Sequence, residues 1–324
     1  MDNVLFLNPP IGTERCGIYQ YGDYIVNGLK TYITKFNVIY GNVGTPEDLF
    51  SLTQAYSPRV IIFNWVPPAM GGWLYRDICI QTNAITMAII HDLFMYWDEN
   101  LKPDSSTHIF DKLIFPDPSP LAKESVGNDP NAFITNRAIP DYIPKPPPNE
   151  FTIGTAGFGA GHKGFCWLVE TIQKEFDEAK IRLHLPHSFY GDNEGHSSQA
   201  RVRECLEIIT KPGVTLEATH DFLPLNAYLD WLSENTMIAY FYDGMGEHQG
   251  VAGSPDYALA VHRPIAISSS HMFRHLFSAE PTIRIESSSL REILNNGTKS
   301  LQSFYEEWTM ESLARRYEEI IESL

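Results

Sequence analysis

One stretch near residue 240 limits the fold of this 324-residue chain more than any other. Residues 237–242 read Met-Ile-Ala-Tyr-Phe-Tyr, which is typical of a buried parallel strand. Four glycines follow, then Ser254 as a helix cap, and a second apolar run starts at Ile265. The order strand, glycine loop, helix, strand predicts a doubly wound α/β unit, and N–H groups at the helix start suit a phosphate or diphosphate. An ordinary crossover whose glycines only turn the chain is the alternative.

A second glycine loop lies earlier in the sequence and also follows an expected strand. Residues 157–164 read Gly-Phe-Gly-Ala-Gly-His-Lys-Gly and lie between an expected strand and an expected helix. Lys163 supplies a point charge in that loop that suits a diphosphate, although a glycine-rich loop with a lysine is a weak signal by itself. The pattern GxxxxGK[ST] is absent, so the loop is not a P-loop. An exposed loop lysine without a ligand is the alternative interpretation.

Apolar periodicity divides the rest of the chain into alternating strands and helices. Strands are expected at 4–7, 36–40, 60–64, 84–90, 108–115, 131–135, 151–156, 181–185, 214–217, 237–242, 265–267 and 282–285. Helices are expected at 18–30, 46–55, 73–82, 165–176, 198–209, 225–234, 254–261, 290–295 and 304–324.

A proline-rich segment at 140–150 predicts a stiff linker. The predicted domains are therefore 1–145 and 151–303, followed by an amphipathic terminal helix at 304–324. This organisation leaves two α/β halves of similar size.

Composition excludes several classes of protein. The formal net charge of −16 argues against an extensive nucleic-acid or anionic-membrane surface. No apolar run is long enough to cross a membrane, and the start of the chain does not resemble a signal peptide. The four cysteines show neither metal-ligand nor CxxC spacing, which favours reduced thiols in a cytoplasmic protein. They are Cys16, Cys79, Cys166 and Cys205.

His91 is the histidine of most interest, because it follows directly on the expected strand 84–90. Ligands of open α/β sheets bind outside the carboxyl ends of the strands. His91 would face the same crevice as Gly12 and Gly17, with Asp92 beside it. A structural histidine that bonds to the backbone is the alternative.

The order and spacing of these pieces resemble the GT-B glycosyltransferases, in particular the retaining, nucleotide-sugar-dependent enzymes of family 4. The terminal helix, with Trp308 and the pair Arg316-Tyr317, is also similar to that family. Four segments carry the resemblance: Gly17–Tyr21, the apolar strand that runs into His91–Phe94, Gly154–Gly164, and the stretch from Asp243 that ends in Ala258–Ala266.

The resemblance implies two Rossmann-like doubly wound domains and a C-terminal helix that crosses back to the first. The first domain would select the acceptor. The second would bind a nucleoside-diphosphate sugar, of the UDP or GDP type. No DxD motif occurs, so no metal is expected. The reaction would be sugar transfer, with retention, to an acceptor that the sequence does not identify: a glycan, small molecule, lipid or protein.

The resemblance also implies site residues. In the family's pair of glutamates, Asp256 takes the second position, and the first falls on Glu247 or His248. The expected catalytic residues are His91, Lys163, Glu247 and His248. The expected donor-binding residues are Gly12, Arg15, Gly17, Gly159, Lys163, Gln249, Gly250, Val251, Ser254 and Asp256.

Two other functions stay open on the sequence. One is a GT-B-like sugar-nucleotide epimerase, which would need acid and base groups at the sugar. The other is a nucleotide-sugar-binding or accessory protein without transfer, which the unmatched first glutamate favours. A nicotinamide enzyme is disfavoured because no GxGxxG opens a helix after the first strand.

Overall fold

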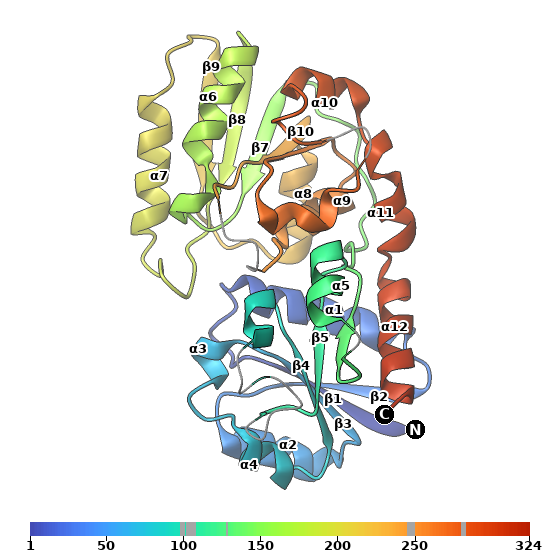
Figure 1. Ribbon diagram of the computed structural model, residues 1–324. Helices are drawn as coiled ribbons and strands as arrows, with labels where there is room; N and C mark the ends of the chain where they lie inside the picture. Colours follow the sequence, from blue (N-terminus) through green and yellow to red (C-terminus); the bar gives the residue numbers. More distant parts are fainter. Residues whose placement is uncertain (98–100, 102–107, 128, 245–249, 280–282) are drawn as a thin grey trace. The chain divides into compact units, whose positions relative to one another are not determined.

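The computed structural model describes residues 1–97, 101, 108–127, 129–244, 250–279 and 283–324 (Figure 1). The chain forms two compact units. The first contains Met1–Ala138, Gly250 and Glu307–Leu324, and the second contains the other described residues. The change from one unit to the other at residue 138 precedes the proline-rich segment.

The first unit is built on a six-stranded parallel sheet of order β2-β1-β3-β4-β5-β6. Figure 1 shows helices on both sides of it. The strands are β1 (Asp2–Asn8), β2 (Phe36–Asn42), β3 (Val60–Asn64), β4 (Ile85–Ile89), β5 (Lys112–Phe115) and β6 (Ala132–Ile134). The helices are α1 (Gly17–Tyr32), α2 (Pro46–Tyr56), α3 (Pro67–Met70), α4 (Arg76–Gln81), the 3-10 helix η1 (Leu93–Trp97), α5 (Pro120–Val126) and α12 (Met310–Glu322).

The second unit is built on a five-stranded parallel sheet of order β11-β10-β7-β8-β9. The strands are β7 (Thr152–Ala156), β8 (Ala179–His184), β9 (Val214–Thr219), β10 (Met237–Tyr240) and β11 (Ile265–Ile267). The helices are η2 (Gly161–Lys163), α6 (Phe165–Glu175), α7 (His196–Glu207), α8 (Leu225–Ser233), α9 (Ser254–Ala260), η3 (His271–Leu276), α10 (Leu290–Asn296), η4 (Lys299–Leu301) and α11 (Gln302–Glu307).

Burial on both faces explains why apolar and polar residues do not alternate along the central strands. In β1, Val4 to Leu7 are at most 1% exposed, and all five residues of β3 are buried. Parallel strands covered by helices on both faces read as continuous apolar runs. The helices supply the matching apolar stripes, as on α1, where Ile25 and Leu29 face the core.

The terminal helix packs on the first unit. Gly28 on α1 leaves room for Met310, because a Cβ at position 28 would collide with the methionine side chain. Tyr317 and Ile321 on α12 are also buried. The predicted fold class is confirmed: two Rossmann-like parallel sheets, with a final helix on the first unit.

The terminal helix is not continuous, however. The predicted helix 304–324 is broken into α11 and α12 at Trp308 and Thr309. The Thr309 hydroxyl accepts the Ser312 N–H at 3.1 Å and so caps α12, and Trp308 is buried. A capping residue inside an apparently regular pattern restarted the helix.

Other elements also differ from the sequence prediction. Strand β5 begins at Lys112 rather than residue 108, and the helix expected at 73–82 is limited to α4. Helix α5 was not predicted, although Ser119 caps it and Pro120 opens it. The strand expected at 282–285 is, among the described residues, a single bridge between Arg284 and Ile267.

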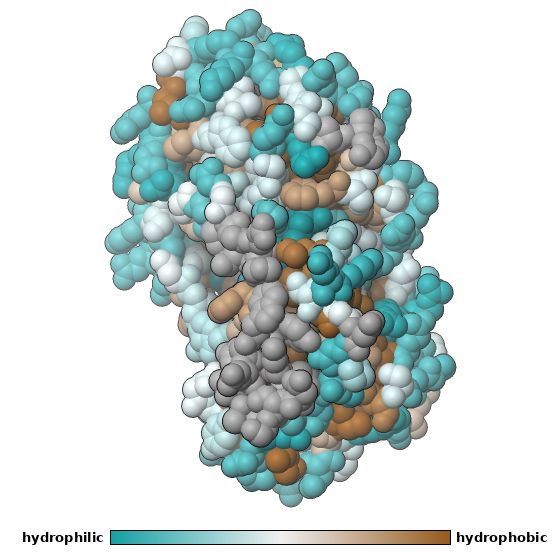
Figure 2. Space-filling model, viewed as in Figure 1, coloured by the Kyte–Doolittle hydropathy of each residue, from teal (hydrophilic) through white to brown (hydrophobic). Residues whose placement is uncertain are grey.

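Hydrophilic side chains dominate the face drawn in Figure 2. Within the described residues, every helix is too short or too polar to cross a lipid bilayer.

Candidate functional site

Each sheet has one point where the strand order reverses. In the first sheet it lies between β1 and β3, and in the second between β7 and β10. The connections leave such a point in opposite directions, so a crevice opens at the carboxyl ends of the two strands. The polar residues at each of these points are described for each unit by itself.

In the first unit, an amide pair spans the reversal point. Asn8 ends β1 and Asn64 ends β3, and both side chains are 0% exposed. Asn64 Nδ2 donates to Asn8 Oδ1 at 2.7 Å and to the Ile18 carbonyl at 2.7 Å. Asn64 Oδ1 lies 2.8 Å from His91 Nε2. A chain of hydrogen bonds therefore fixes His91 from the two central strands.

The amide pair sets a strict limit on helix α1. A Cβ at Gly22 would collide with both Asn8 Oδ1 and Asn64 Nδ2. Only a residue without a side chain lets α1 approach the two amides this closely. Gly22 is therefore part of the support of the site.

The hydrogen bonds also determine the form of the His91 ring. Asn64 donates through its nitrogen, so its oxygen accepts, and His91 Nε2 carries the proton. Burial of the ring, together with the nearby charge of Arg137, lowers the pKa of His91 from 6.5 to about 3. His91 is therefore neutral at pH 7, and Nδ1 is left as the acceptor of the ring.

Tyr21 and Arg137 enclose the same histidine. The Tyr21 ring meets the His91 ring edge to face, at 5.1 Å between centroids. The Arg137 guanidinium lies 4.8 Å from the centroid of the Tyr21 ring. The positive charge is held close to His91 without contact to bulk solvent, since Arg137 is 3% exposed.

The other residues predicted for this crevice lie on the loop after β1. Gly12 has φ +99°, a backbone conformation that favours glycine. Arg15 is partly exposed, and Gly17 is the first residue of α1.

Asp92, the residue after His91, accepts a hydrogen bond from a second predicted site residue. The Gly250 N–H donates to Asp92 Oδ1 at 2.6 Å, and both residues belong to the first unit.

In the second unit, the glycine loop after β7 lies against the end of β10. Gly164 has φ +54°, and a Cβ there would collide with the Phe241 carbonyl oxygen. The Asp243 N–H donates to the His162 carbonyl at 2.6 Å. A Cβ at Gly159 would lie 2.5 Å from Ser198 Cα, so this glycine permits close contact with α7. Gly159 and Gly164 therefore allow neighbouring segments to pack closely, in addition to letting the chain turn.

Lys163 bridges the reversal point of the second sheet. Its Nζ donates to the Tyr242 hydroxyl at 2.8 Å, and that hydroxyl lies 3.4 Å from Ser254 Oγ at the start of α9. Tyr242 is 3% exposed, rests on Phe273 at 4.6 Å between ring centroids, and accepts the Ser268 hydroxyl at its carbonyl. The lysine is thus held by a rigid, buried partner.

The charge of Lys163 has no counter-ion in the part of the second unit that the structure describes. Its partner there is a neutral hydroxyl, and no ion pair to a carboxylate is formed by this lysine among the described residues. Burial and the lysine charge together lower the pKa of the adjacent His162, against the opposing charge of Asp243, and so favour its neutral form. A half-buried cation beside neutral donors is suited to an anionic ligand.

The remaining predicted residues are distributed as follows. Val251 and Ser254 are partly exposed, whereas Asp256, in the first turn of α9, is 1% exposed. Glu247, His248 and Gln249 lie outside the described residues. Across the described ranges, no three His, Cys, Asp or Glu side chains are grouped as metal ligands.

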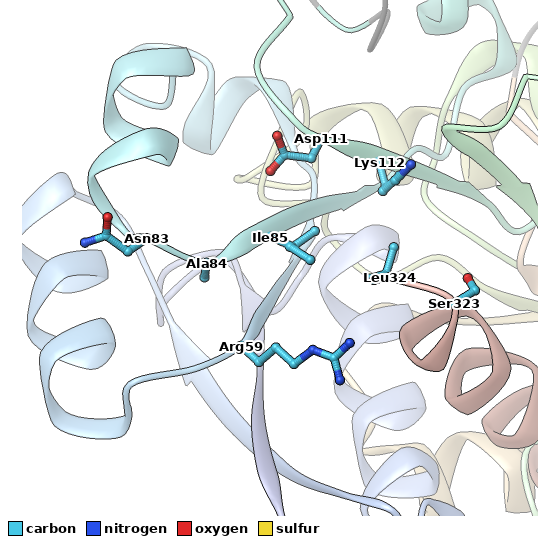
Figure 3. Close-up of a pocket in the computed structure, with 8 residues that line it drawn as sticks. All are labelled: Arg59, Asn83, Ala84, Ile85, Asp111, Lys112, Ser323 and Leu324. Atoms are coloured by element: carbon cyan, nitrogen blue, oxygen red, sulfur yellow. The ribbon is translucent and has the colours of Figure 1, made fainter.

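A cavity of about 610 Å³ opens on the first unit, away from these residues (Figure 3). It is lined by Arg59, Ile85 and Lys112, among others. Ile85 and Lys112 are the first residues of β4 and β5. The cavity therefore lies at the amino ends of the strands, the edge opposite to His91.

Comparison with known proteins gives a clear result for the fold. No family model matches the chain. No curated protein matches it. Among solved structures, a glycosyltransferase from Rickettsia africae ESF-5 is similar with a TM-score of 0.68 at 9% identity, over 98% of this chain and 97% of that one.

Two further structures agree over nearly the whole chain. Anabaena Alr3699/HepE in complex with UDP and glucose gives a TM-score of 0.62 at 12% identity, over 98% of this chain and 95% of that chain. The lipopolysaccharide outer core galactosyltransferase WaaB, in its apo form, gives 0.61 at 11% identity, over 99% of each chain. The chain therefore has the GT-B fold of these glycosyltransferases.

The polar residues at the strand ends that were missed in the sequence are Asn8, Asn64 and Tyr242; Gly22 and Arg137 were missed as well. Each of the first three stands at or just after the carboxyl end of a predicted strand, which was the available signal. Strand ends alone do not show which side chains meet across a sheet.

Proposed function

We propose that this protein is a glycosyltransferase that moves a sugar from a nucleoside-diphosphate sugar to an acceptor. Lys163 carries this proposal. It is a half-buried cation at the reversal point of the second sheet, and among the described residues its polar partner is the Tyr242 hydroxyl. A diphosphate is a ligand whose charge matches this position.

The proposed chemistry is electrostatic. As the bond between sugar and diphosphate breaks, negative charge grows on the leaving phosphate. A preorganised cation lowers the energy of that state without reorganising during the reaction. Lys163 is held in advance by Tyr242, and the Ser254 hydroxyl, which lies 3.4 Å from the Tyr242 hydroxyl, is a further donor.

The glycine loop would add backbone donors to this clamp. Gly159 lies in it. Gln249, Gly250 and Val251 stay proposed donor-binding residues from the sequence, although the Gly250 N–H already donates to Asp92 Oδ1. Asp256 is proposed for the ribose hydroxyls, and either Glu247 or His248 for the donor sugar. Gly12, Arg15 and Gly17 stay proposed donor-binding residues of the first unit.

His91 has a separate proposed role at the sugar or the acceptor. Its pKa of about 3 makes it a weak base at pH 7, so it would act as a fixed, neutral hydrogen-bonding group. Its unprotonated Nδ1 accepts, for example from a sugar hydroxyl. This role is compatible with a retaining reaction in which the leaving phosphate assists attack on the same face, and it requires no metal.

UDP is the first nucleotide to test. The Anabaena protein of the same fold was crystallised with UDP and glucose, and a second structure of that protein contains UDP. GDP is the second choice. The identity of the acceptor is not part of this proposal.

The direct test is turnover of a panel of UDP- and GDP-sugars, with release of the nucleoside diphosphate as the signal. A transferase is expected to hydrolyse its donor slowly without acceptor, and NMR of the released sugar reports the anomeric configuration. Conversion of the donor into another sugar nucleotide would favour the epimerase. Tight binding without turnover, with and without acceptor mixtures, would favour an accessory binding protein.

Lys163→Ala and Lys174→Ala form a matched pair for this assay. Lys174 is an exposed lysine near the end of α6, so its removal changes the net charge equally and leaves the loop intact. Loss of turnover in the first variant only supports the proposed clamp. Equal turnover in both variants would contradict it.

A further inference from the structure

Two cysteines far apart in the sequence have their sulfur atoms side by side. Cys166 Sγ lies 3.5 Å from Cys205 Sγ, and both are free thiols. A disulfide bond joins sulfurs at ~2.05 Å, so the two sulfurs would have to approach each other further for a bond to form.

The fold places this pair where two helices pack. Cys166 is the second residue of α6, and Cys205 is near the end of α7. Figure 1 shows α6 and α7 side by side over one face of the second sheet. Gln173 on α6 donates to the Ile208 carbonyl at 3.0 Å, which fixes the two helices beyond the thiols. The sulfurs are therefore held together by rigid elements.

The two thiols differ in access. Cys166 is partly exposed, whereas Cys205 is 0% exposed. Glu204 Oε2 lies 4.0 Å from Cys166 Sγ, and Arg201 balances that carboxylate through an ion pair of 2.6 Å. Cys166 is therefore the thiol that an oxidant can reach, whereas Cys205 is buried next to it.

We propose that Cys166 and Cys205 form an oxidisable dithiol, a modification site that takes a small disulfide such as oxidised glutathione. This proposal is independent of the proposed transferase function.

The exchange proceeds in two balanced steps. The Cys166 thiolate attacks one sulfur of the oxidant, a mixed disulfide forms, and one glutathione thiolate leaves. Cys205 then loses its proton and attacks Cys166 Sγ, and the second glutathione thiolate leaves. The dithiol is oxidised to one disulfide, and the oxidised glutathione is reduced to two molecules of glutathione.

Burial affects the second step. It raises the pKa of the Cys205 thiol, so this residue is the resolving group rather than the first nucleophile. Its closeness to Cys166 offsets the small fraction of thiolate, because the attack is intramolecular. The product would tie α6 to α7.

The test uses the full chain, fully reduced and then treated with oxidised glutathione without metal ions. Remaining thiols are alkylated, and intact and tryptic masses are measured. Lys174 and Arg203 lie between the cysteines, so trypsin separates them unless they are bonded. We expect loss of the mass of two hydrogen atoms and one linked peptide pair, with Cys16 and Cys79 alkylated.

The Cys205→Ser variant provides the control for the order of events. It is expected to keep one glutathione on Cys166, and Cys166→Ser is expected to gain none at Cys205. The link should form at least about tenfold faster in the folded wild type than in the protein unfolded with urea, because folding supplies the proximity.

Three results would overturn the proposal: a stable glutathione adduct on Cys166 in the wild type, no link in the folded protein, or a link that forms equally fast when unfolded. If a serine variant does not fold, the comparison of folded and unfolded wild type still decides.

Discussion

Lys163 Nζ donates a hydrogen bond of 2.8 Å to the hydroxyl of Tyr242, and this bond crosses the reversal point of the second sheet. The lysine comes from the loop after β7, and the tyrosine follows β10. The two strands are neighbours in the sheet, although their sequences are some eighty residues apart. The proposed diphosphate clamp depends on this bond, because it fixes the cation before a ligand arrives.

Tyr242→Phe is therefore expected to weaken UDP binding. The phenyl ring keeps its contact with Phe273, and only the hydroxyl that holds Lys163 is lost. A hydrogen bond to a charged group contributes ~1.5–3 kcal/mol, and part of this is recovered by water, so we expect an affinity about tenfold lower by calorimetry.

A double-mutant cycle separates positioning from general damage. If Tyr242 acts through Lys163, Tyr242→Phe has little further effect once Lys163→Ala is present, and the coupling energy is ~1 kcal/mol or more. Additive effects would show that Tyr242 does not act through the lysine.

Gly22→Ala is expected to destabilise the first unit. The new methyl group would collide with the buried amides of Asn8 and Asn64, and overpacking of this kind costs about 1–3 kcal/mol. Gly72→Ala is the control, since a Cβ there meets no atom within 4 Å. Denaturant unfolding measures both. Equal stability of the two variants would contradict the close approach of α1.

Acid is expected to destabilise the protein through His91. Its folded pKa of about 3 lies below the ordinary 6.5, so between these values the unfolded chain binds a proton that the folded chain does not. The contribution of the neutral ring is fully present above pH 6.5 and is lost as the pH falls towards 3.

His91→Gln isolates this effect from other titrating groups. Burial also lowers the pKa of His184 to about 4, and carboxylates titrate in the same range. Glutamine keeps an N–H for Asn64 but cannot titrate. The free energy of unfolding of this variant should therefore fall less steeply with acid than that of the wild type. Parallel curves would mean that His91 titrates normally.

Much of the fold was readable because its signals are local. The run from Val60 to Asn64 predicted β3 to the residue, since a strand buried on both faces is apolar throughout. The glycine loop before α6 and its lysine were equally visible. Here the local preference and the tertiary structure agree.

The errors arise where several signals compete or where contacts are distant. Thr309 restarts a helix inside an apolar pattern that looks continuous, and its capping bond is invisible in that pattern. The pairing of Cys166 with Cys205 follows from the packing of two helices, not from spacing. The Asn64–His91 contact likewise depends on sheet order, which the sequence suggests only through resemblance.

Titration of UDP into wild type, Lys163→Ala and Lys174→Ala by calorimetry tests the central claim most directly. We expect measurable binding in the wild type and in Lys174→Ala. We expect binding at least tenfold weaker in Lys163→Ala, because a charge-assisted contact to phosphate contributes ~1.5–3 kcal/mol. Circular dichroism confirms that the variants fold. UDP binding that is equally tight in all three proteins would contradict the assignment of Lys163 to the diphosphate. If the wild type binds neither UDP nor GDP, the assignment of a nucleotide-sugar donor site to this protein is wrong.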